Sequence, residues 1–138
     1  MKIKILSNNV NSFKRATPGS AGFDLYPVES GVISPGDSIK IKTGVALSLD
    51  INTVGLLCSR SGIGSKGINV INRPGIIDSD YRGEILIALH NESPYYYEYS
   101  PNEAVAQLII VPTYAGSFEF VDELDSTYRG CNGFGSTS

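Results

Sequence analysis

The sequence predicts an all-β fold, a sandwich or jelly roll. Its 138 residues include 15 glycines and 7 prolines, spread in short clusters that suit many short strands joined by turns. Several segments alternate apolar and polar residues, as in Ser38-Ile-Lys-Ile-Lys-Thr-Gly-Val45. Only a short stretch is compatible with a helix, and no long 3.6-residue periodicity occurs. Many short strands without long helices are typical of packed β-sheets.

We expect strands, in chain order, at residues 2–6, 22–27, 31–33, 37–49, 53–59, 68–71, 83–91, 96–99 and 104–112. Turn signals stand at strand boundaries, among them Pro35-Gly36 and Ser100-Pro-Asn-Glu103. No repeat and no linker divides these strands, and the length suits one domain with a real core. We therefore predict a β jelly-roll catalytic domain over residues 1–125 and a flexible C-terminal segment over residues 126–138.

Charge and targeting signals narrow the function classes. The formal net charge is −3, so no global basic field indicates nucleic-acid binding, and a polyanionic ligand would need local donors or a metal ion. Residues 1–6 are too short an apolar run for a signal peptide, and no run approaches bilayer length. Cys58 and Cys131 form no C-x-x-C pair, which predicts two reduced thiols rather than a zinc site. We expect a soluble cytoplasmic protein, in the host cytoplasm if the source is a virus.

An acidic turn at residues 72–83 is the most informative segment. It places the carboxylates of Asp78 and Asp80 and the phenol of Tyr81 between two apolar strands. Loop tips held by rigid strands often carry binding and catalytic groups, and a carboxylate there can act as a general base. The alternative is a solvated turn, because Asp, Ser and Gly favour turns for local reasons.

A glycine- and serine-rich loop at residues 59–67 follows an apolar strand. Its small residues expose backbone N–H groups, and Arg60 and Lys66 add positive charge, which suits phosphate oxygens. The loop lacks the G-x-x-x-x-G-K-[ST] spacing of a Walker A motif. An ordinary connection between two strands is the alternative.

Two polar residues interrupt apolar strands. Asp24 stands alone in Ala21-Gly-Phe-Asp-Leu-Tyr26, although Asp is depleted in strands and a buried lone charge is costly. A salt bridge or a strand-end position would explain it, and a contact to a metal ion or phosphate-bound water is the functional alternative. Gln107 similarly lies in Ala104-Val-Ala-Gln-Leu-Ile-Ile-Val111, either as a hydrogen-bonded core amide or as a ligand contact.

The C-terminal residues 129–138 combine glycines and small polar residues with one Arg and one Phe. Such a segment cannot bury enough apolar surface to order by itself. It is either a frayed terminus or a lid that becomes ordered over a ligand.

Five of these segments, in this order, resemble the motifs of the homotrimeric dUTPase family. They are Ala21-Gly-Phe-Asp-Leu-Tyr26, Ser59-Arg-Ser-Gly62, Gly75-Ile-Ile-Asp-Ser-Asp-Tyr-Arg-Gly83, Ala104-Val-Ala-Gln-Leu108 and Arg129-Gly-Cys-Asn-Gly-Phe-Gly-Ser-Thr137. The chain departs from the family pattern at Ser59, where the family usually has Pro, and at Tyr26-Pro27, where a small residue is usual. The family fold is a β jelly roll, which agrees with the strand pattern.

The resemblance implies a dUTP diphosphatase that uses Mg²⁺ to form dUMP and pyrophosphate. It implies that Asp78 is the general base for a water that attacks the α-phosphorus, and that Asp24 meets the metal ion through a coordinated water. It also implies a homotrimer whose active sites are shared between subunits, with no nucleic-acid or membrane partner.

The resemblance further assigns the substrate contacts. The phosphates would meet Arg60, Ser61, Gly62 and Gln107. The uracil and deoxyribose would meet residues of the acidic hairpin, namely Asn72, Gly75, Ile76, Ile77, Tyr81 and Leu86, with Ile77 roughly opposite Leu86. The tail would close over the nucleotide with Arg129, Phe134, Gly135 and Ser136.

Two other functions remain open. A dCTP deaminase shares the fold but would need a different catalytic acid in place of the Asp78 pattern. A regulatory protein that binds a partner protein could also be built on the dUTPase scaffold.

Overall fold

A computed structural model describes residues 1–8 and 13–133 of the chain. The described part contains ten strands and one helical turn, which are β1 (Lys2–Ile5), β2 (Phe23–Leu25), β3 (Gly31–Ile33), β4 (Ser38–Ser48), β5 (Thr53–Cys58), α1 (Ser61–Gly64), β6 (Ile68–Val70), β7 (Gly75–Ile77), β8 (Glu84–Asn91), β9 (Tyr97–Tyr99) and β10 (Ala106–Pro112). The prediction of an all-β jelly roll is confirmed. Each predicted strand is present, the one at residues 31–33 with the same bounds and the others trimmed by one or two residues at an end.

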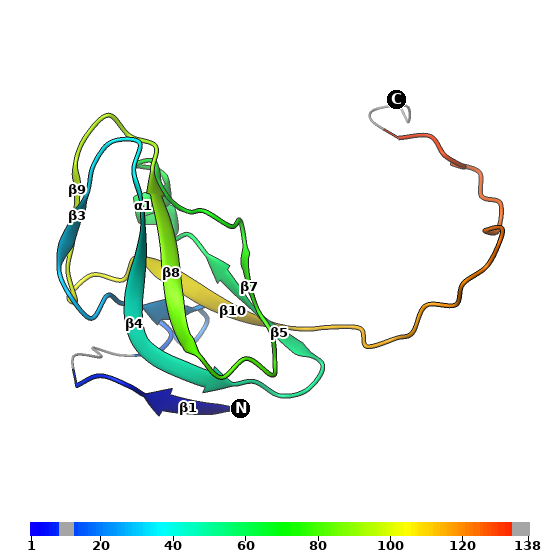
Figure 1. The fold of residues 1–138 in the computed structure, drawn as a ribbon, viewed down its shortest axis with the longest axis horizontal. Helices are drawn as coiled ribbons and strands as arrows, with labels where there is room; N and C mark the ends of the chain where they lie inside the picture. Colours follow the sequence, from blue (N-terminus) through cyan, green and yellow to red (C-terminus); the bar gives the residue numbers. More distant parts are fainter. Residues whose placement is uncertain (9–12, 134–138) are drawn as a thin grey trace.

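The strands form two four-stranded antiparallel sheets and a two-stranded ribbon. One sheet has the order β1-β4-β8-β6, and the other has the order β2-β10-β5-β7. The ribbon of β3 and β9 extends from one end of the body (Figure 1). Consecutive strands of the described chain lie in different sheets, so the chain crosses repeatedly from one sheet to another, as in a jelly roll.

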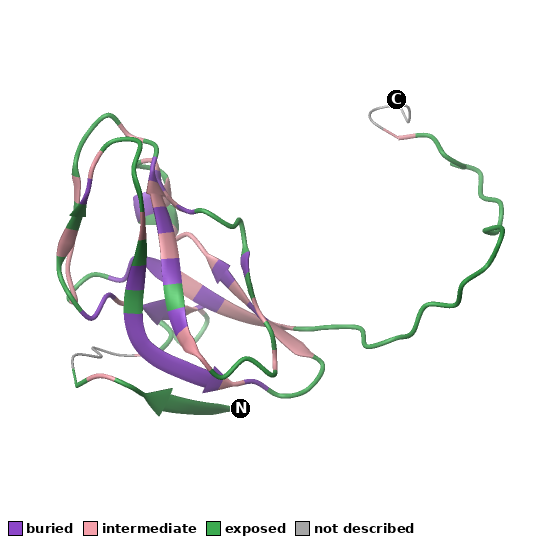
Figure 2. Ribbon diagram, viewed as in Figure 1, coloured by how far each residue is buried: buried purple, intermediate pink, exposed green. Residues whose placement is uncertain are grey.

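The core lies between the two sheets and follows from strand alternation. Along β8, Ile85, Ile87 and Leu89 are fully buried, while the residues between them are more exposed (Figure 2). Leu108 of β10 and Val105 just before it fill the core from the opposite sheet. Burial of these branched side chains supplies the main driving force for folding.

An irregularity in β4 changes which side chains it buries. The pairing of β4 with β8 shifts register between Lys42 and Ala46, and Gly44 has a φ of 69° that favours glycine. Before the shift, lysines alternate with buried or half-buried isoleucines, and after it every residue up to Leu47 is buried. The carboxylate of Glu84 accepts a hydrogen bond of 2.8 Å from the Gly44 N–H, which satisfies a donor displaced by the bulge.

The structure corrects the expected geometry of the acidic hairpin. Its first arm contains a strand that the sequence did not predict, β7, and this strand pairs with β5. Its second arm is β8, which pairs with β4 and β6 in the opposite sheet. The two arms are therefore not hydrogen-bonded to each other among the described strands, and they separate to form the walls of a cavity.

The chain leaves the body after β10 and runs outward as an extended segment (Figure 1). The Thr113 N–H donates to the Asn52 carbonyl at 2.8 Å, and the later backbone hydrogen bonds of the described tail stay within the tail. Tyr114, Phe118, Phe120 and Tyr128 of this segment are almost fully exposed. The boundary expected at residue 125 stays a prediction, as does the role of the tail as a lid.

The structure also describes the two cysteines and the helical content of the chain. Both cysteines are free, and burial raises the pKa of the Cys58 thiol above its ordinary value. Within the described ranges, no helix has the length and apolar character that crossing a bilayer requires.

Candidate active site

A polar cavity of about 330 Å³ gathers residues from three of the predicted motifs. Its lining residues are Ala16, Ser20, Gly22, Asp24, Arg60, Ser61, Gly62 and Gln107. Five of these were predicted as site residues, although they are separated by up to 83 positions in the sequence. We call this space the polar cavity.

An ion pair between Asp24 and Arg60 forms one wall of the polar cavity. The Nε atom of Arg60 lies 3.1 Å from Oδ1 of Asp24, and one terminal nitrogen donates to Oδ2 at 3.4 Å. The other terminal nitrogen of Arg60 donates to the Ala104 carbonyl at 3.0 Å. Asp24 is only 7% exposed, so the guanidinium compensates a carboxylate that would otherwise be buried alone. The salt-bridge interpretation of Asp24 is confirmed.

Strand pairing places Gln107 beside this ion pair. Gln107 of β10 stands opposite Asp24 on one side and Cys58 on the other. Its amide nitrogen donates to the Ser59 carbonyl at 3.1 Å, so the amide is hydrogen-bonded and also lines the cavity. Gly22 allows this close approach, because a Cβ there would lie 2.6 Å from the Gln107 side-chain oxygen.

The loop at residues 59–67 contains the single helical turn α1. Arg60 stands at its N-cap position, and the Gly64 and Ser65 N–H groups donate to the carbonyls of Arg60 and Ser61. The first N–H groups of a helix lack intrahelical partners, so Ser61 and Gly62 can present donors to the polar cavity. Lys66 follows the turn and does not line this cavity.

A second cavity, of about 180 Å³, lies between the separated arms of the acidic hairpin. Its lining residues are Ile76, Ile77, Asp78, Tyr81, Glu84 and Leu86. Five of them were predicted as site residues, and Ile77 and Leu86 share the cavity as expected. We call this space the slot.

Tyr81 is held in place at the edge of the slot. Its hydroxyl donates to the Glu84 carbonyl at 3.1 Å, and its backbone N–H donates to the Asp78 carbonyl at 3.2 Å. Any side chain at Gly83 would collide with the Tyr81 phenol, so glycine is needed next to this ring. Tyr81 therefore presents a fixed aromatic surface although it is half-exposed.

The two acids of the turn occupy different positions. Asp78 lines the slot, whereas Asp80 is exposed and lies outside both cavities. Asn72 is exposed and lines neither cavity, and Gly75 is buried against Leu57. The structure thus brings together most, but not all, of the hairpin residues assigned by resemblance.

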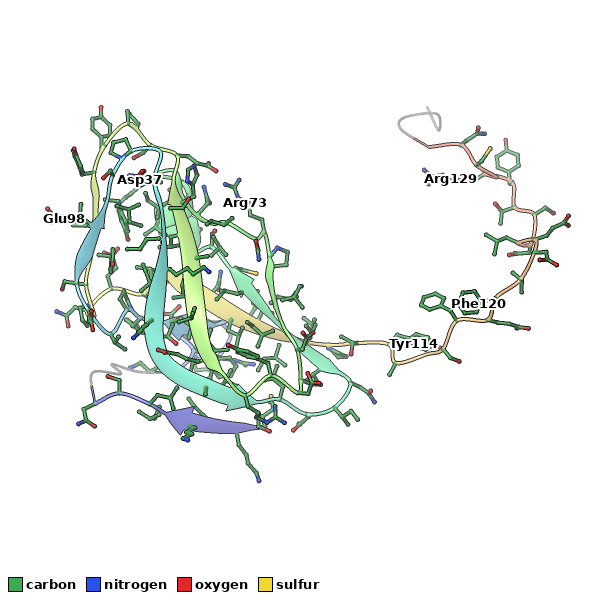
Figure 3. The ribbon with its side chains drawn as sticks, viewed as in Figure 1. Asp37, Arg73, Glu98, Tyr114, Phe120 and Arg129 are labelled. Carbon is green, nitrogen blue, oxygen red and sulfur yellow. The ribbon has the colours of Figure 1, made fainter. Side chains whose placement is uncertain are left out.

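The predicted tail residues lie apart from both cavities. Arg129 belongs to the outward segment in Figure 3, where its Nε donates to the Asn132 carbonyl at 2.9 Å. Phe134, Gly135 and Ser136 fall outside the described residues.

Several neighbouring residues were not predicted from the sequence. Ala16, Ser20 and Gly22 line the polar cavity, and Glu84 lines the slot. Gly22 and Glu84 could have been predicted from the sequence. Gly22 lies in the segment of residues 21–26 that holds Asp24, and Glu84 directly follows the acidic turn at residues 72–83. Ala16 and Ser20 precede β2 in an irregular segment that gives no periodic signal.

Sheet order explains why the site is divided. The sheet β2-β10-β5-β7 carries the polar cavity on β2, β10 and the end of β5, and one wall of the slot on β7 at its opposite edge. The two cavities share no lining residue. The geometry defines a jelly-roll protein that offers cationic and amide donors in one place, and a half-apolar slot with a carboxylate in another.

Comparison with known proteins identifies the class. The family model described as dUTPase matches residues 8–138. A deoxyuridine 5'-triphosphate nucleotidohydrolase of Desulfitobacterium hafniense is 44% identical over 126 residues, covering 88% of this chain and 83% of the relative. The Corynebacterium glutamicum protein of the same name is 42% identical over 139 residues, covering 99% and 93%. The chain belongs to the dUTPase family.

Solved structures agree with this assignment. A dUTPase of Staphylococcus bacteriophage 80alpha, a mutant with dUpNHpp, is 30% identical with a TM-score of 0.87, and the match covers 99% of this chain and 97% of that one. A mutant dUTPase from phage phi11 of S. aureus, described as coordinating a structural Mg(II) ion, is 28% identical with a TM-score of 0.81 and coverage of 88% and 96%.

Tyr97 of β9, which packs against the hydrophobic core, supplies a test of the packing. Its hydroxyl oxygen is buried and has no partner among the described residues. Burial and the charge of Glu103 raise the pKa of Tyr97 from 10.0 to about 12, although Arg60 opposes the shift. The folded chain therefore keeps a proton that the unfolded chain loses above pH 10, so stability should fall as the pH rises from 10 to about 12.

We expect the Tyr97→Phe variant to lose less stability than wild type across this window, as measured by urea unfolding at a series of pH values. At neutral pH it should be at least as stable, because the unpartnered buried hydroxyl is gone. Tyr96→Phe, at a neighbouring exposed position, is the matched control and should follow wild type. Parallel curves for wild type and Tyr97→Phe would contradict this account.

Proposed function

We propose that this member of the dUTPase family hydrolyses dUTP to dUMP and pyrophosphate, using the slot for the nucleoside and the polar cavity for the phosphates. The observation that supports this most is the position of Asp78, which lines the slot while its neighbour Asp80 does not. Family membership supplies the substrate, and the two cavities supply a place for each part of it.

The slot suits a pyrimidine because it is bounded by two strand edges. β7 pairs with β5 on one side, and its other edge faces the slot. β8 pairs with β6 only at its last three residues, so its edge near Leu86 has no strand partner on that side in the described chain. Backbone N–H and C=O groups at these edges can read the edge of uracil, and cytosine would present a donor where an acceptor is needed.

Selection of the sugar falls to Tyr81. Its ring is fixed by the hydrogen bond to Glu84 and by the absence of a side chain at Gly83. A deoxyribose packed against this ring leaves no space for a 2′-hydroxyl group. Asn72 would contribute its side-chain amide from the adjoining segment.

The phosphates would lie in the polar cavity. Arg60 supplies a guanidinium that is already oriented by Asp24 and by the Ala104 carbonyl. Gln107, Ser61 and Gly62 add amide, hydroxyl and backbone donors to the same space. Fixed donors of this kind stabilise charge that develops during phosphoryl transfer without needing to reorganise.

Asp78 would act as the general base. It would accept a proton from a water molecule whose oxygen attacks the α-phosphorus in line, and the bond between that phosphorus and the bridging oxygen would break. The electron pair of the broken bond leaves with pyrophosphate. Asp78 is exposed in the single chain, so it can reach a water molecule until the nucleotide and the lid cover it.

The donor set fits Mg²⁺ only as an ion held largely by the substrate. Among the described residues, no three His, Cys, Asp or Glu side chains gather closely enough to hold a metal ion. Asp24 is the one carboxylate among the described residues that line the polar cavity, and its oxygens already meet Arg60. Asp24 would therefore touch the ion through coordinated water, and the ion would neutralise charge on the triphosphate.

We further propose a homotrimer in which each tail completes the site of another subunit. The outward path of residues 113–133 keeps Arg129 away from both cavities of its own chain (Figure 3). Almost fully exposed aromatic side chains such as Phe118 and Phe120 need a surface to cover them. Residues 126–138 would form the lid, with Phe134 stacked on uracil and Arg129, Gly135 and Ser136 on the phosphates.

We place the enzyme in the cytoplasm, where thiols such as Cys58 and Cys131 stay reduced.

The function is tested with a panel of dUTP, UTP, dCTP and dTTP in the presence of Mg²⁺, following pyrophosphate and ammonia. We expect pyrophosphate from dUTP and at most traces from the others, because the slot reads both the base edge and the sugar. Release of ammonia from dCTP would identify a deaminase instead, and equal turnover of UTP would overturn the role of Tyr81.

The Asp78→Asn variant tests the general base. It should fold and bind dUTP but hydrolyse it slower by about 10²- to 10⁴-fold, because the amide cannot accept the proton. Asp80→Asn is the matched control two residues away and should retain wild-type turnover. Binding is measured by calorimetry and turnover by pyrophosphate release. Equal turnover in wild type and Asp78→Asn would remove Asp78 from the reaction.

Mixed oligomers test whether the lid acts between subunits. A variant truncated before Arg129 and the Asp78→Asn variant should each be nearly inactive alone. When the two are unfolded together and refolded, sites that combine Asp78 of one chain with the tail of another should restore activity to well above either parent. No restoration, in oligomers shown by native mass spectrometry to be mixed, would place the lid within its own chain.

A further inference from the structure

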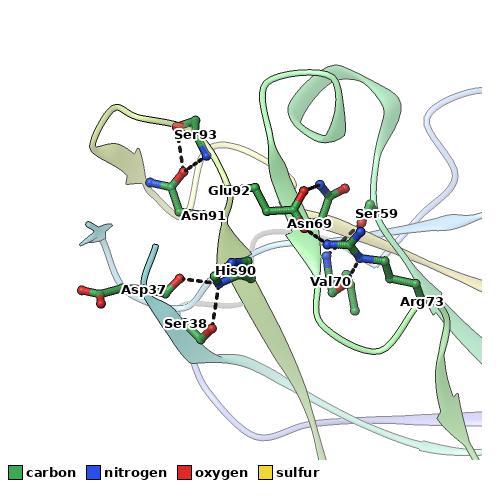
Figure 4. A network of polar contacts seen from close by, with 10 residues as sticks. All are labelled: Asp37, Ser38, Ser59, Asn69, Val70, Arg73, His90, Asn91, Glu92 and Ser93. Atoms are coloured by element: carbon green, nitrogen blue, oxygen red, sulfur yellow. Dashed lines mark hydrogen bonds and ion pairs between the residues drawn. The ribbon is translucent and has the colours of Figure 1, made fainter. Parts of the chain in front are cut away.

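An ion pair between Arg73 and Glu92 lies beside the segment that joins β6 to β7 (Figure 4). Arg73 also donates from Nε to the Val70 carbonyl at 3.3 Å. Its guanidinium therefore bridges the end of β6 and the end of β8. We call this arrangement, with Glu92 at its centre, the Glu92 clamp.

Glu92 contacts the β6 region at three points. One carboxylate oxygen receives the Arg73 guanidinium, and the other accepts a hydrogen bond of 3.2 Å from the Asn69 side chain. The Glu92 backbone N–H donates to the Gly67 carbonyl at 2.8 Å. A single residue at the end of β8 thus fixes the start of β6, its middle, and the segment that follows it.

Hydrogen bonds also connect β6 to the residues of the polar cavity. The Val70 N–H donates to the Ser59 hydroxyl at 2.9 Å, and the Ser59 carbonyl accepts the Gln107 amide at 3.1 Å. Ser59 thus joins β6 to Gln107 through its hydroxyl and its carbonyl. β6 is accordingly held between the phosphate side of the site and the Glu92 clamp.

The segment after β6 has few other constraints. Ile71, two residues before Arg73, donates its backbone N–H to the Ala88 carbonyl of β8 at 2.8 Å. Ala88 follows Leu86, which lines the slot, by two residues along β8. Residues 71–74 are all exposed and make no strand pairs. Asn72 has no hydrogen-bond partner of its own among the described residues, so its position depends on Ile71 before it and Arg73 after it.

We propose that Glu92 is a positioning residue that acts through Arg73 to hold Asn72, which lies outside the slot lining of the single chain and whose amide would contact the substrate, an inference that rests on the proposed function. The side chains of Arg73 and Glu92 are 54% and 41% exposed, so their ion pair contributes little to folding stability. Its effect is geometric, because small displacements of a group that contacts the substrate cost much more in binding and rate than in stability.

Charge exchange across the pair tests the proposal. Arg73→Glu and Glu92→Arg should each raise the KM for dUTP and the inhibition constant of dUMP by about tenfold, with kcat within about twofold of wild type. The double variant restores an opposite pair, and the Asn69 amide can turn to present its oxygen to the new Arg. It should return both constants to within about threefold of wild type. Inhibition by inorganic pyrophosphate, which occupies only the polar cavity, should not change in any variant.

Two controls separate this effect from a general loss of structure. Glu98→Arg makes the same charge change on exposed β9, on the opposite side of the body from Arg73 in Figure 3, and should leave all constants unchanged. Glu92→Gln keeps the shape and one acceptor, so it should fold like wild type and show an intermediate rise in the dUMP constant. Thermal unfolding is measured for every variant.

Three results would overturn the proposal. Unchanged dUMP inhibition in both single variants would show a surface ion pair without a role in binding. An equal rise for pyrophosphate and dUMP would show a general structural effect, and so would a double variant no better than the single ones. Wild-type protein that does not hydrolyse dUTP in the same assay would overturn the proposed function instead, which makes the two failures distinguishable.

Discussion

The site depends on the separation of two strands that follow each other in the chain. β7 must pair with β5 and β8 must pair with β4, so the arms of the acidic turn enter different sheets. Strands that part in this way expose the edges that a paired hairpin would hide. A buried edge without partners is costly in most proteins. Here the unpaired edges become the walls of the slot, and the turn that joins them holds Asp78 and Tyr81 at its mouth.

Electrostatic compensation is the second condition for the site. Asp24 is buried in a strand, and the guanidinium of Arg60 compensates its charge there. The same pairing fixes Arg60 with its remaining surface toward the polar cavity, where the Ala104 carbonyl holds its other end. A structural requirement of one strand thereby orients a cation for phosphate binding. This explains why an acid in an apolar strand and an Arg in a glycine-rich loop occur together in one chain.

The sequence predicted well what depends on local pattern. Alternation identified β4 and β8, and the chain order of five motifs identified the family. Prediction from the sequence failed where contacts between residues far apart in the chain determine the structure. β7 is only three residues long, and nothing local shows that Gly75 must lie against Leu57 of another strand. The partner of Asp24 stands 36 positions away, because β2 and β5 lie on either side of β10. The Arg73–Glu92 pair likewise joins residues 19 positions apart that share no periodic signal.

Strand order also separates the two cavities of one chain. The polar cavity and the slot lie toward opposite edges of the sheet β2-β10-β5-β7, and the tail that begins at the end of β10 leads away from both (Figure 1). In the proposed homotrimer, the slot of one subunit would meet the polar cavity of another. In that arrangement β6 gains particular importance, because it is the strand whose contacts reach both Ser59 on the phosphate side and Glu92 on the base side. A rigid β6 would keep each subunit's two half-sites in a constant relation, and the geometry of all the shared sites would then follow from the symmetry of the assembly.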